Sequence, residues 1–380
     1  MKGTRREFLG QSARMIATGI VGSTVVSNLA NGAEPTPPAT QPAPTKPPVA
    51  LRTLGRTDLN VSVVSLGTAN ASEPVVRYAV EHGVNFIHIA DDYMGGKSLV
   101  EVSKGIKGKR DKLLLGLKTT WKWMDPRADV ILDRDLRKLG TDHVDVIFFH
   151  FHNTPEMVGD PRVKEAFDRW KKAGKVRYMG LTTHGGMKAC MEAAIKTGWY
   201  DCLMPIYNLS MRYEYKSIFN ACEKNKIGFI AMKTMSRRIF GEHFGYVPAM
   251  LRDSAVTTIC KTLPSLAAVK KIIDAAKAPV SDRDAERMVE LAARMDFGRC
   301  RMCGTCTGVC PNGLAVNDLV RSVDYYVDTM GEYDMGKEVF DGIDRSRSAG
   351  VCRDCGQCER ACPNRVPIRH FIRRAGDMFA

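Results

Sequence analysis

Two runs of closely spaced cysteines near the C-terminus are the residues best suited to chemistry in this 380-residue chain. Residues 300–312 and 352–364 both read C-x₂-C-x₂-C-x₃-C-P-N, and they hold eight of the 12 cysteines. Thiols at this spacing can bind three corners of one iron–sulfur cube, and the proline turns the fourth thiol towards another. Zinc is the alternative, because paired C-x₂-C units also build tetrahedral sites. Disulfides are disfavoured, because such spacing favours chelation.

The two runs are near-copies, and they resemble the bacterial ferredoxin arrangement that holds two [4Fe–4S] clusters. The resemblance assigns to the first cluster Cys300, Cys303, Cys306 and Cys362. It assigns to the second cluster Cys352, Cys355, Cys358 and Cys310. Residues 317–344, between the runs, look helical. The other cysteines lack metal spacing and are expected to be buried thiols: Cys190, Cys202, Cys222 and Cys260.

Upstream, residues 51–277 alternate short apolar runs with stretches that carry helix signals, such as Ser72 before Pro74 and Asp160 before Pro161. Apolar runs of this kind are typical of parallel strands buried on both faces. Eight strands are expected, at residues 61–66, 86–89, 113–117, 144–149, 178–181, 202–206, 228–232 and 257–260. Eight β/α units predict an α/β fold, a (β/α)₈ TIM barrel with its chemistry at the C-terminal strand ends. A doubly wound open sheet is the alternative.

Polar side chains follow these expected strands in a regular order. They are Tyr93, Lys118, His150, His184, Lys233 and Lys261. Together with the opening residues 51–57 (LRTLGRT) and residues 83–87 (GVNFI), this order resembles the aldo/keto reductases. The resemblance implies an oxidoreductase barrel followed by a smaller, mainly helical ferredoxin-like iron–sulfur domain at residues 281–380.

The family's catalytic tetrad is Asp, Tyr, Lys and His, and three members carry over by resemblance. Tyr93 would be the proton donor, Lys118 the cation that stabilises its phenolate, and His150 the group that orients a carbonyl. A phenol is a poor acid at neutral pH unless an ammonium lies beside it. His88 stands where the family has the aspartate, so either His88 itself or a neighbouring carboxylate (Asp91 or Asp92) would have to hold the lysine.

The resemblance also implies NADP(H), although its contact residues differ from the usual ones. Thr182 and Thr183 replace a Ser-Asn pair, Met232 replaces the aromatic residue that stacks on nicotinamide, and Lys261 remains to bind a 2′-phosphate. Lys270 and Lys271 replace the Glu-Asn pair that reads adenine. Trp121 and Trp123 follow the third strand, where the fold builds its substrate pocket, and could stack on a sugar-like ligand or pack a loop.

Two other functions are compatible with these residues. His88, His150, His152 and His184 all follow barrel strands and could hold a divalent metal for hydrolysis or lyase chemistry. An electron-transfer protein with an inactive barrel is the other alternative. A nicotinamide delivers two electrons at once, whereas each cluster handles one, so the clusters are expected either to be structural or to serve an external electron partner.

The N-terminal residues look like an export signal. Residues 4–9 (TRREFL) resemble the twin-arginine motif, and a weakly apolar stretch follows, so residues 1–33 are expected to be a signal peptide. Residues 34–50 hold seven prolines and are expected to form a stiff linker. The expected location is therefore periplasmic, or otherwise outside the cytoplasm, with no membrane span after cleavage.

The formal net charge of +14 could indicate a nucleic-acid partner, but the basic residues are dispersed along the chain rather than clustered. The sequence therefore predicts an exported iron–sulfur oxidoreductase that acts on a small carbonyl or alcohol, with Tyr-Lys-His acid–base chemistry and no nucleic-acid partner.

Overall fold

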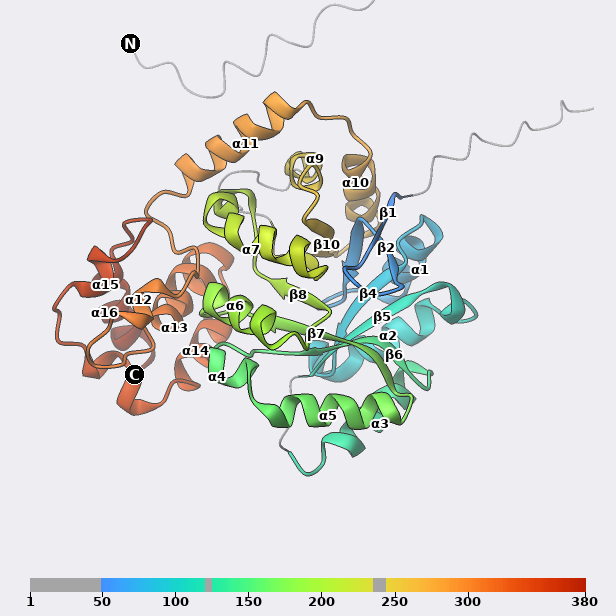
Figure 1. The fold of residues 1–380 in the computed structure, drawn as a ribbon, viewed down its shortest axis with the longest axis horizontal. Helices are drawn as coiled ribbons and strands as arrows, with labels where there is room; N and C mark the ends of the chain where they lie inside the picture. The colour runs from blue at the N-terminus through green and yellow to red at the C-terminus, as the bar shows by residue number, and fades with distance from the viewer. Residues whose placement is uncertain (1–48, 120–124, 235–243) are drawn as a thin grey trace, which may run out of the picture. The chain divides into compact units, whose positions relative to one another are not determined.

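The computed structural model describes residues 49–119, 125–234 and 244–380, and its first part is a closed barrel of parallel strands (Figure 1). The strands are hydrogen-bonded in the order β10-β3-β4-β5-β6-β7-β8-β9. Their bounds are β3 (Val64–Gly67), β4 (Phe86–Ala90), β5 (Leu114–Thr119), β6 (Val144–Phe149), β7 (Val176–Thr183), β8 (Cys202–Pro205), β9 (Gly228–Met232) and β10 (Val256–Thr262). The closed order confirms the (β/α)₈ barrel and excludes the open sheet.

One expected strand was wrong in its extent. Residues 61–66 are divided between two elements, because β2 (Asn60–Ser62) pairs antiparallel with β1 (Leu51–Thr53) outside the barrel. Barrel strand β3 starts only at Val64. The hairpin turn packs against the start of β9, since a Cβ on Gly55 would lie 2.3 Å from the backbone nitrogen of Gly228. The apolar residues therefore continue from β2 into β3 through a bend of the chain, and their composition does not reveal that bend.

Helices follow the strands and cover the barrel. Those up to β10 are α1 (Glu73–Glu81), η1 (Tyr93–Gly96), α2 (Lys97–Gly105), η2 (Arg110–Lys112), α3 (Ala128–Leu139), α4 (Pro155–Val158), α5 (Pro161–Lys172), α6 (Met187–Thr197), η3 (Leu209–Met211), α7 (Arg212–Asn225) and α9 (Tyr246–Leu251), and α10 (Leu266–Ala276) follows β10. Asp160 accepts a hydrogen bond from the backbone N–H of Arg162 and begins α5, as expected from the Asp-Pro pair. Ser72 stands at the N-cap of α1, but its side chain makes no capping bond.

The C-terminal segment is mainly helical and forms its own apolar core. Its elements are α11 (Asp282–Met295), α12 (Thr305–Gly308), α13 (Val316–Val320), η4 (Arg321–Met330), α14 (Tyr333–Asp341), η5 (Arg345–Arg347), η6 (Ala349–Val351), α15 (Gln357–Arg360) and α16 (Ile368–Phe379). The segment between the cysteine runs is helical, as expected, and η4 is a π-helix.

The two cysteine runs repeat the same backbone path. The residue before the second cysteine of each run, Met302 or Asp354, has a left-handed φ of 53°. Gly304 and Gly356, directly after that cysteine, follow with φ of 85° and 71°, and a short helix then starts in each run. The sequence repeat is thus a structural repeat.

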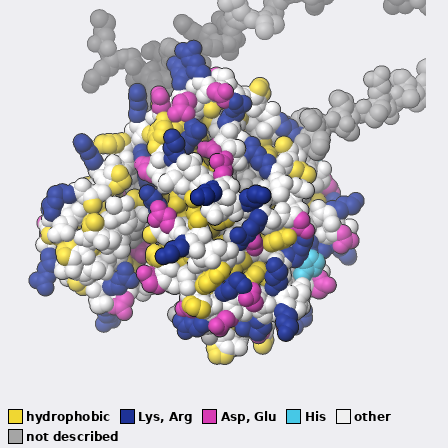
Figure 2. Space-filling model, viewed as in Figure 1, with side chains coloured by type: hydrophobic (Ala, Val, Ile, Leu, Met, Phe, Trp, Pro, Cys, Tyr) yellow, Lys and Arg dark blue, Asp and Glu magenta, His cyan; other side chains and the backbone are white. Residues whose placement is uncertain are grey.

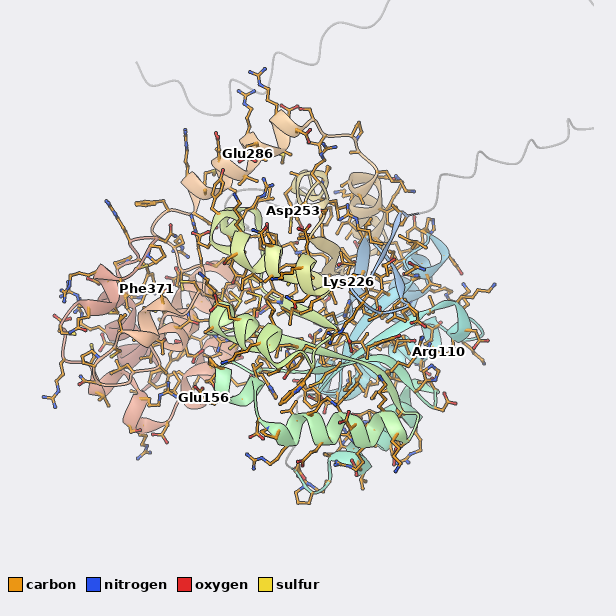
Figure 3. The ribbon with its side chains drawn as sticks, in the orientation of Figure 1. Arg110, Glu156, Lys226, Asp253, Glu286 and Phe371 are labelled. Carbon is orange, nitrogen blue, oxygen red and sulfur yellow. The ribbon has the colours of Figure 1, made fainter. Side chains whose placement is uncertain are left out.

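Helix α11 links the barrel to the C-terminal segment. Ser281 caps it by accepting from the backbone N–H of Asp284. The guanidinium of Arg212 joins it to the barrel by binding Glu286 on α11 at 2.7 Å and Asp253 at 3.3 Å. Figure 3 labels both carboxylates. Helix α11 therefore packs on the barrel, although its sequence leads into the cysteine segment.

The surface shows no segregation of charge on the face drawn in Figure 2, where Lys and Arg side chains are mixed with Asp and Glu. The four cysteines without metal spacing are all buried, as expected. Within the described ranges, no helix is long and apolar enough to cross a membrane. Residues 1–48 lie outside the described residues, as do Trp121 and Trp123.

Candidate functional site

Tyr93 and Lys118 meet at the C-terminal end of the barrel. Lys118 lies near the end of β5, beside Ala90 of β4, and Tyr93 begins η1 directly after that strand. The ammonium of Lys118 donates a 3.1 Å hydrogen bond to the Tyr93 hydroxyl. Burial opposes the charge of Lys118, but the Tyr93 hydroxyl, Cys260 and Asp92 hold its pKa above the ordinary lysine value. The expected proton donor and its cation are therefore in contact.

His150 lies directly after β6, beside His184 from the end of β7. Their ring centroids are 5.2 Å apart, and Phe151 packs against both rings. Burial, followed by the charges of Lys118 and Lys233, holds the pKa of His150 well below that of an exposed histidine. Burial and then Lys233 do the same for the pKa of His184. Both imidazoles are therefore neutral and can offer an N–H to a substrate oxygen.

The sequence left two candidates for the role of the family aspartate, His88 and a neighbouring carboxylate, and His88 bonds to Ser65 instead. Its Nε2 lies 3.1 Å from the Ser65 hydroxyl, and its ring packs against Phe86 inside the barrel. Burial and the charge of Lys118 hold the pKa of His88 well below its ordinary value. The physical reason is position, because His88 pairs with Gly116, two residues before Lys118 along β5. The carboxylate that acts on Lys118 is instead Asp92.

The four histidines do not converge on one point. His152 packs on Phe149 at 5.7 Å between ring centroids, and burial lowers the pKa of His152 to about 4. His88 is held at Ser65, and His150 contacts His184. In the parts of the chain that the structure describes, no three His, Cys, Asp or Glu side chains are placed to hold a single metal ion. The geometry therefore gives no support to a divalent-metal barrel site.

Three residues at this end of the barrel hold strained backbone conformations. Met94, Phe151 and Lys233 have φ values of 56°, 59° and 52°, in the left-handed region that non-glycine residues rarely adopt. They follow β4, β6 and β9. Strain of this kind persists where surrounding packing holds it, and it is concentrated at functional sites. The strand ends that carry the candidate site are thus held in unusual geometry.

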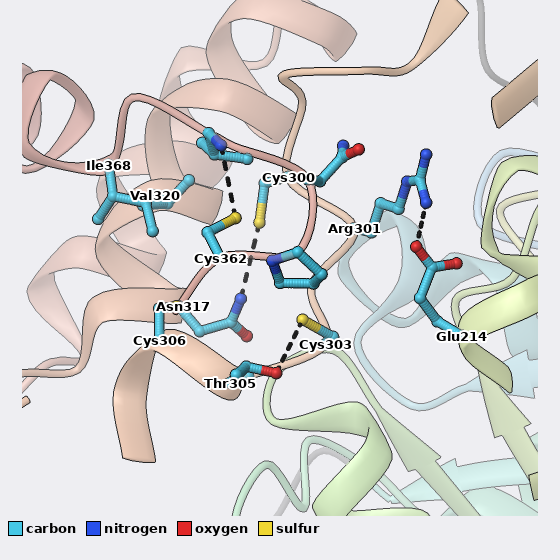
Figure 4. Close-up of a pocket in the computed structure, with 14 residues that line it drawn as sticks. Glu214, Cys300, Arg301, Cys303, Thr305, Cys306, Asn317, Val320, Cys362 and Ile368 are labelled. Atoms are coloured by element: carbon cyan, nitrogen blue, oxygen red, sulfur yellow. Dashed lines mark hydrogen bonds and ion pairs between the residues drawn. The ribbon is translucent and has the colours of Figure 1, made fainter. Parts of the chain in front are cut away.

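A cavity in the C-terminal segment gathers the four cysteines that the sequence assigns to the first cluster. Its volume is about 430 Å³, and its lining includes Cys300, Cys303, Cys306 and Cys362 (Figure 4). Barrel residue Glu214, at the start of α7, also lines it and forms an ion pair with Arg301. Four thiols around one cavity suit a group held at several corners.

A second cavity gathers the other four cysteines. Its volume is about 330 Å³, and its lining includes Cys310, Cys352, Cys355 and Cys358. Every residue that lines it comes from the C-terminal segment, between Cys310 and Ile372. The structure thus exchanges the fourth cysteine between the two runs, as the sequence analysis expects.

Backbone N–H groups already point at several of these sulfurs. Met302 donates to Cys300 at 3.4 Å, and Asp354, its counterpart in the second run, donates to Cys352 at 3.5 Å. Such donors stabilise thiolate ligands and tune the potential of a cluster. Burial raises the pKa of the Cys306 thiol to about 12, so this side chain needs a metal group to hold it deprotonated.

Asn317 connects the first cysteine cavity to the barrel. Its Nδ2 lies 3.8 Å from the sulfur of Cys300, and its Oδ1 accepts a 3.0 Å bond from the backbone N–H of Gly186. Gly186 follows β7 and stands two residues after His184. A short chain of contacts therefore runs from a cysteine of the first cavity to the histidine pair at the barrel end.

Comparison with known proteins agrees with this geometry. A profile described as the aldo/keto reductase family matches residues 66–292, which is more than half of the chain. The chain belongs to the aldo/keto reductase family. A second profile, described as a 4Fe-4S dicluster domain, matches residues 292–363. The protein is thus an oxidoreductase barrel joined to an iron–sulfur domain, as the sequence predicts.

Curated proteins that match parts of this aldo/keto reductase include the following two. The uncharacterized oxidoreductase YqkF of Bacillus subtilis is 28% identical over 149 residues, which are 35% of this chain and 48% of that protein. The F420-dependent formate dehydrogenase subunit beta of Methanocaldococcus jannaschii is 31% identical over 78 residues, 20% of each chain. The chain therefore spans about half or less of these relatives.

Solved structures with the same fold include an aldo-keto reductase of Bacillus halodurans in its holo form. That structure has a TM-score of 0.56 and 19% identity, over 64% of this chain and 96% of the other. A thermostable aldo-keto reductase in complex with the inhibitor epalrestat has a TM-score of 0.53 and 20% identity, over 63% and 99% of the two chains. At these identities the likeness shows the barrel fold alone.

Three residues that the resemblance assigns to nicotinamide contacts are buried in this structure. Thr182, Thr183 and Met232 are buried, at 0%, 1% and 6% exposed. The Thr183 hydroxyl donates to the backbone oxygen of Gly185, and the cluster domain covers the chain directly beyond it. Lys261, at the end of β10, is half-buried.

Sequence reasoning gave no role to Asn317, Arg321 and Tyr325, and it did not place Lys233 in a site. Lys233 could have been found, because it directly follows Met232 at a strand end. The others carry no such signal, since the contact of Asn317 with Gly186 joins residues 131 positions apart. Only the docking of the two domains brings them to the barrel.

The domain junction leads to a stability prediction. A Cβ on Gly304 would lie 2.7 Å from the Cα of Gly186, whereas a Cβ on its counterpart Gly356 would meet only arginine side chains, at 3.3 Å and beyond. We expect Gly356→Ala to cost about 1 kcal/mol through its positive φ. Gly304→Ala should cost a further 1–3 kcal/mol or so through overpacking.

Thermal unfolding of both variants, loaded with iron and kept anaerobic, measures this difference. The Tm of Gly304→Ala should lie below that of Gly356→Ala, and both should lie below wild type. Equal Tm values for the two variants would show that this contact between the domains is not tightly packed.

Proposed function

We propose that this protein is an exported iron–sulfur oxidoreductase that interconverts a small carbonyl compound and its alcohol at the C-terminal end of the barrel. The single observation that carries the proposal is the 3.1 Å hydrogen bond between the Lys118 ammonium and the Tyr93 hydroxyl. This pair can deliver a proton to a carbonyl oxygen and stabilise the phenolate that remains. His150, held neutral, orients the same oxygen by donating a hydrogen bond.

The eight cysteines of the two cavities are proposed as the ligands of two [4Fe–4S] clusters. The first cluster would be held by Cys300, Cys303, Cys306 and Cys362, and the second by Cys352, Cys355, Cys358 and Cys310. When bound, each cluster exchanges one electron at a time. The first cavity is lined in part by the barrel residue Glu214, and the second lies within the cluster domain.

The positions of the two cysteine cavities support an order for electron transfer through the two clusters. An external one-electron carrier would meet the second cluster, where Cys355 is exposed, and the first cluster would face the barrel. Reduction of a carbonyl to an alcohol takes two electrons and two protons, so two one-electron transfers balance each turnover. Tyr93 supplies the proton that reaches oxygen, and the second proton reaches carbon from solvent.

Export through the twin-arginine pathway is part of the proposal. Residues 4–9 carry the twin-arginine pattern, and this pathway carries proteins that have already folded around their cofactors. A redox protein outside the cytoplasm has no free nicotinamide pool to draw on. An electron carrier in the same compartment would therefore be its partner, which agrees with the buried state of Thr182, Thr183 and Met232.

The choice of reductant tests this function. The protein is purified anaerobically, iron and sulfide are measured, and carbonyl substrates are offered with either reduced methyl viologen or NADPH. We expect turnover with the viologen and none with NADPH. Turnover with NADPH alone would overturn the electron route, and absence of turnover with both, across sugars, aldehydes and keto acids, would indicate an inactive barrel.

A further inference from the structure

Helix η4 of the cluster domain lies against the C-terminal end of the barrel. The ammonium of Lys233, directly after β9, lies 4.8 Å from the ring centroid of Tyr325 and 5.1 Å from that of Tyr326. The guanidinium of Arg321, at the start of η4, lies 5.9 Å from the Tyr326 ring. The barrel and the cluster domain thus build one site together.

This site collects positive charge around neutral histidines. After burial itself, Lys233, His150, Arg321 and Lys118 lower the pKa of His184, in that order. Three cations, one on β5, one directly after β9 and one on η4, therefore act on the imidazole of His184. Gathering like charges in a buried place is unfavourable unless an opposite charge joins them.

Among the described residues, carboxylates balance these cations only in part. Asp318 binds the Nη2 of Arg321 at 2.8 Å, but the Nε and Nη1 of Arg321 are buried without a hydrogen-bond partner among the described residues. Arg321 as a whole is 4% exposed. Within the same described ranges, the ammonium of Lys233 lies over the rings of Tyr325 and Tyr326 and forms no ion pair with a carboxylate. A buried donor left unpaired costs about 1–3 kcal/mol, and more when it is charged.

The backbone that presents these side chains is itself unusual. Helix η4 is a π-helix over its 10 residues, a form that is rare and often found at functional sites. Lys233 holds a left-handed φ of 52°. The unusual backbone of η4 in the cluster domain and of Lys233 in the barrel costs free energy. The surrounding packing therefore holds Arg321 and Lys233 in place against that cost.

We propose that Arg321 and Lys233 form an anion subsite and that the substrate carries a carboxylate beside its reacting carbonyl or alcohol. This inference rests on the proposed function and adds the substrate class. Guanidinium and ammonium groups bind carboxylates through charge-assisted hydrogen bonds. The neutral His150 and His184 would then hold the reacting oxygen towards Tyr93, so that a 2-oxo acid or a sugar acid fits the arrangement.

The first iron–sulfur cluster is the competing partner for Arg321, since a [4Fe–4S] group with four thiolates is also an anion. Arg321 follows Val320, which lines the first cysteine cavity, but Arg321 itself does not line it. Its charge acts instead on His184 and Lys233 in the barrel. The structure therefore favours a ligand at the barrel end.

Binding of a matched pair of probes tests the subsite without turnover. Pyruvate and its amide, pyruvamide, have nearly the same shape and differ in charge. Calorimetric titration of the loaded, oxidised protein should show pyruvate binding at least about 10-fold more tightly. Arg321→Met and Lys233→Met should each remove this preference, while the exposed Lys107→Met, a control of equal charge change, should keep it.

Further measurements distinguish a role of Arg321 in substrate binding from a role at the first cluster. Iron and sulfide content should stay unchanged in Arg321→Met. If the variant lost iron together with its affinity for pyruvate, Arg321 would belong to the cluster, and its role in the anion subsite would be overturned. Arg321→Lys should keep part of the preference. Equal affinity of wild type for the two probes would overturn the subsite. Tyr93→Phe should bind pyruvate normally, because binding is measured without turnover. A failure of the proposed reaction would therefore leave the binding result unchanged.

Discussion

Replacing Tyr93 by phenylalanine is expected to lower kcat by a factor of about 10²–10⁴, the usual contribution of a positioned general acid. The substitution removes a single oxygen and leaves the ring in place. The ammonium of Lys118 then loses the hydroxyl that it contacts at 3.1 Å, and no group remains to protonate the carbonyl oxygen. KM should change little, because the lost interaction matters mainly in the transition state.

Initial rates with reduced methyl viologen, measured over a range of substrate concentrations, separate kcat from KM. Tyr213→Phe is the matched control, because its hydroxyl binds Glu286 on the barrel exterior at 2.8 Å and the residue is 52% exposed. Iron content and the visible spectrum should be the same in both variants. A Tyr93→Phe variant with the kcat of wild type would remove Tyr93 from the mechanism.

The second large effect concerns the cluster ligands. Cys303→Ser and Cys355→Ser should each lose about four of eight irons, since the two residues line different cavities. Cys303→Ser should abolish viologen-driven turnover, because the first cavity is the one that borders the barrel. Cys355→Ser removes the exposed entry point and should slow turnover strongly while leaving the first cluster in place.

Iron and sulfide analysis, together with electron paramagnetic resonance of the reduced protein, distinguishes the two clusters. Cys222→Ser is the control, because Cys222 is a buried thiol on α7 without metal spacing, and it should keep all of its iron. If Cys303→Ser and Cys355→Ser both keep full colour and iron, the ligand assignment is incorrect.

Much of this molecule could be predicted from local sequence. Cysteines three residues apart lie close together in a compact loop, and the resemblance to bacterial ferredoxins predicts both ligand sets. The structure gathers the same two sets of four. Eight apolar runs predict the barrel, because strands buried on both faces need such runs. The order of Tyr93, Lys118 and His150 along the strands places them at one end, where parallel strands all finish.

Other predictions depended on geometry that the sequence does not carry. His88 occupies the position of the family aspartate, yet its side chain bonds to Ser65 inside the barrel. Thr182, Thr183 and Met232 read as cofactor contacts, but they are buried at the ends of their strands. In each case a residue's neighbours, rather than its type, decide its role.

The sequence by itself determined a (β/α)₈ barrel joined to a two-cluster domain, because cysteine spacing and strand periodicity are local properties, and the order of its strand-end residues carried the resemblance to the aldo/keto reductases. Only the tertiary structure decided how the two parts work together. Asn317, Arg321 and Tyr325 come from the cluster domain, and they reach Gly186, His184 and Lys233 of the barrel across more than 90 residues of sequence. Such contacts depend on how two surfaces fit, and no local pattern in the chain encodes that fit.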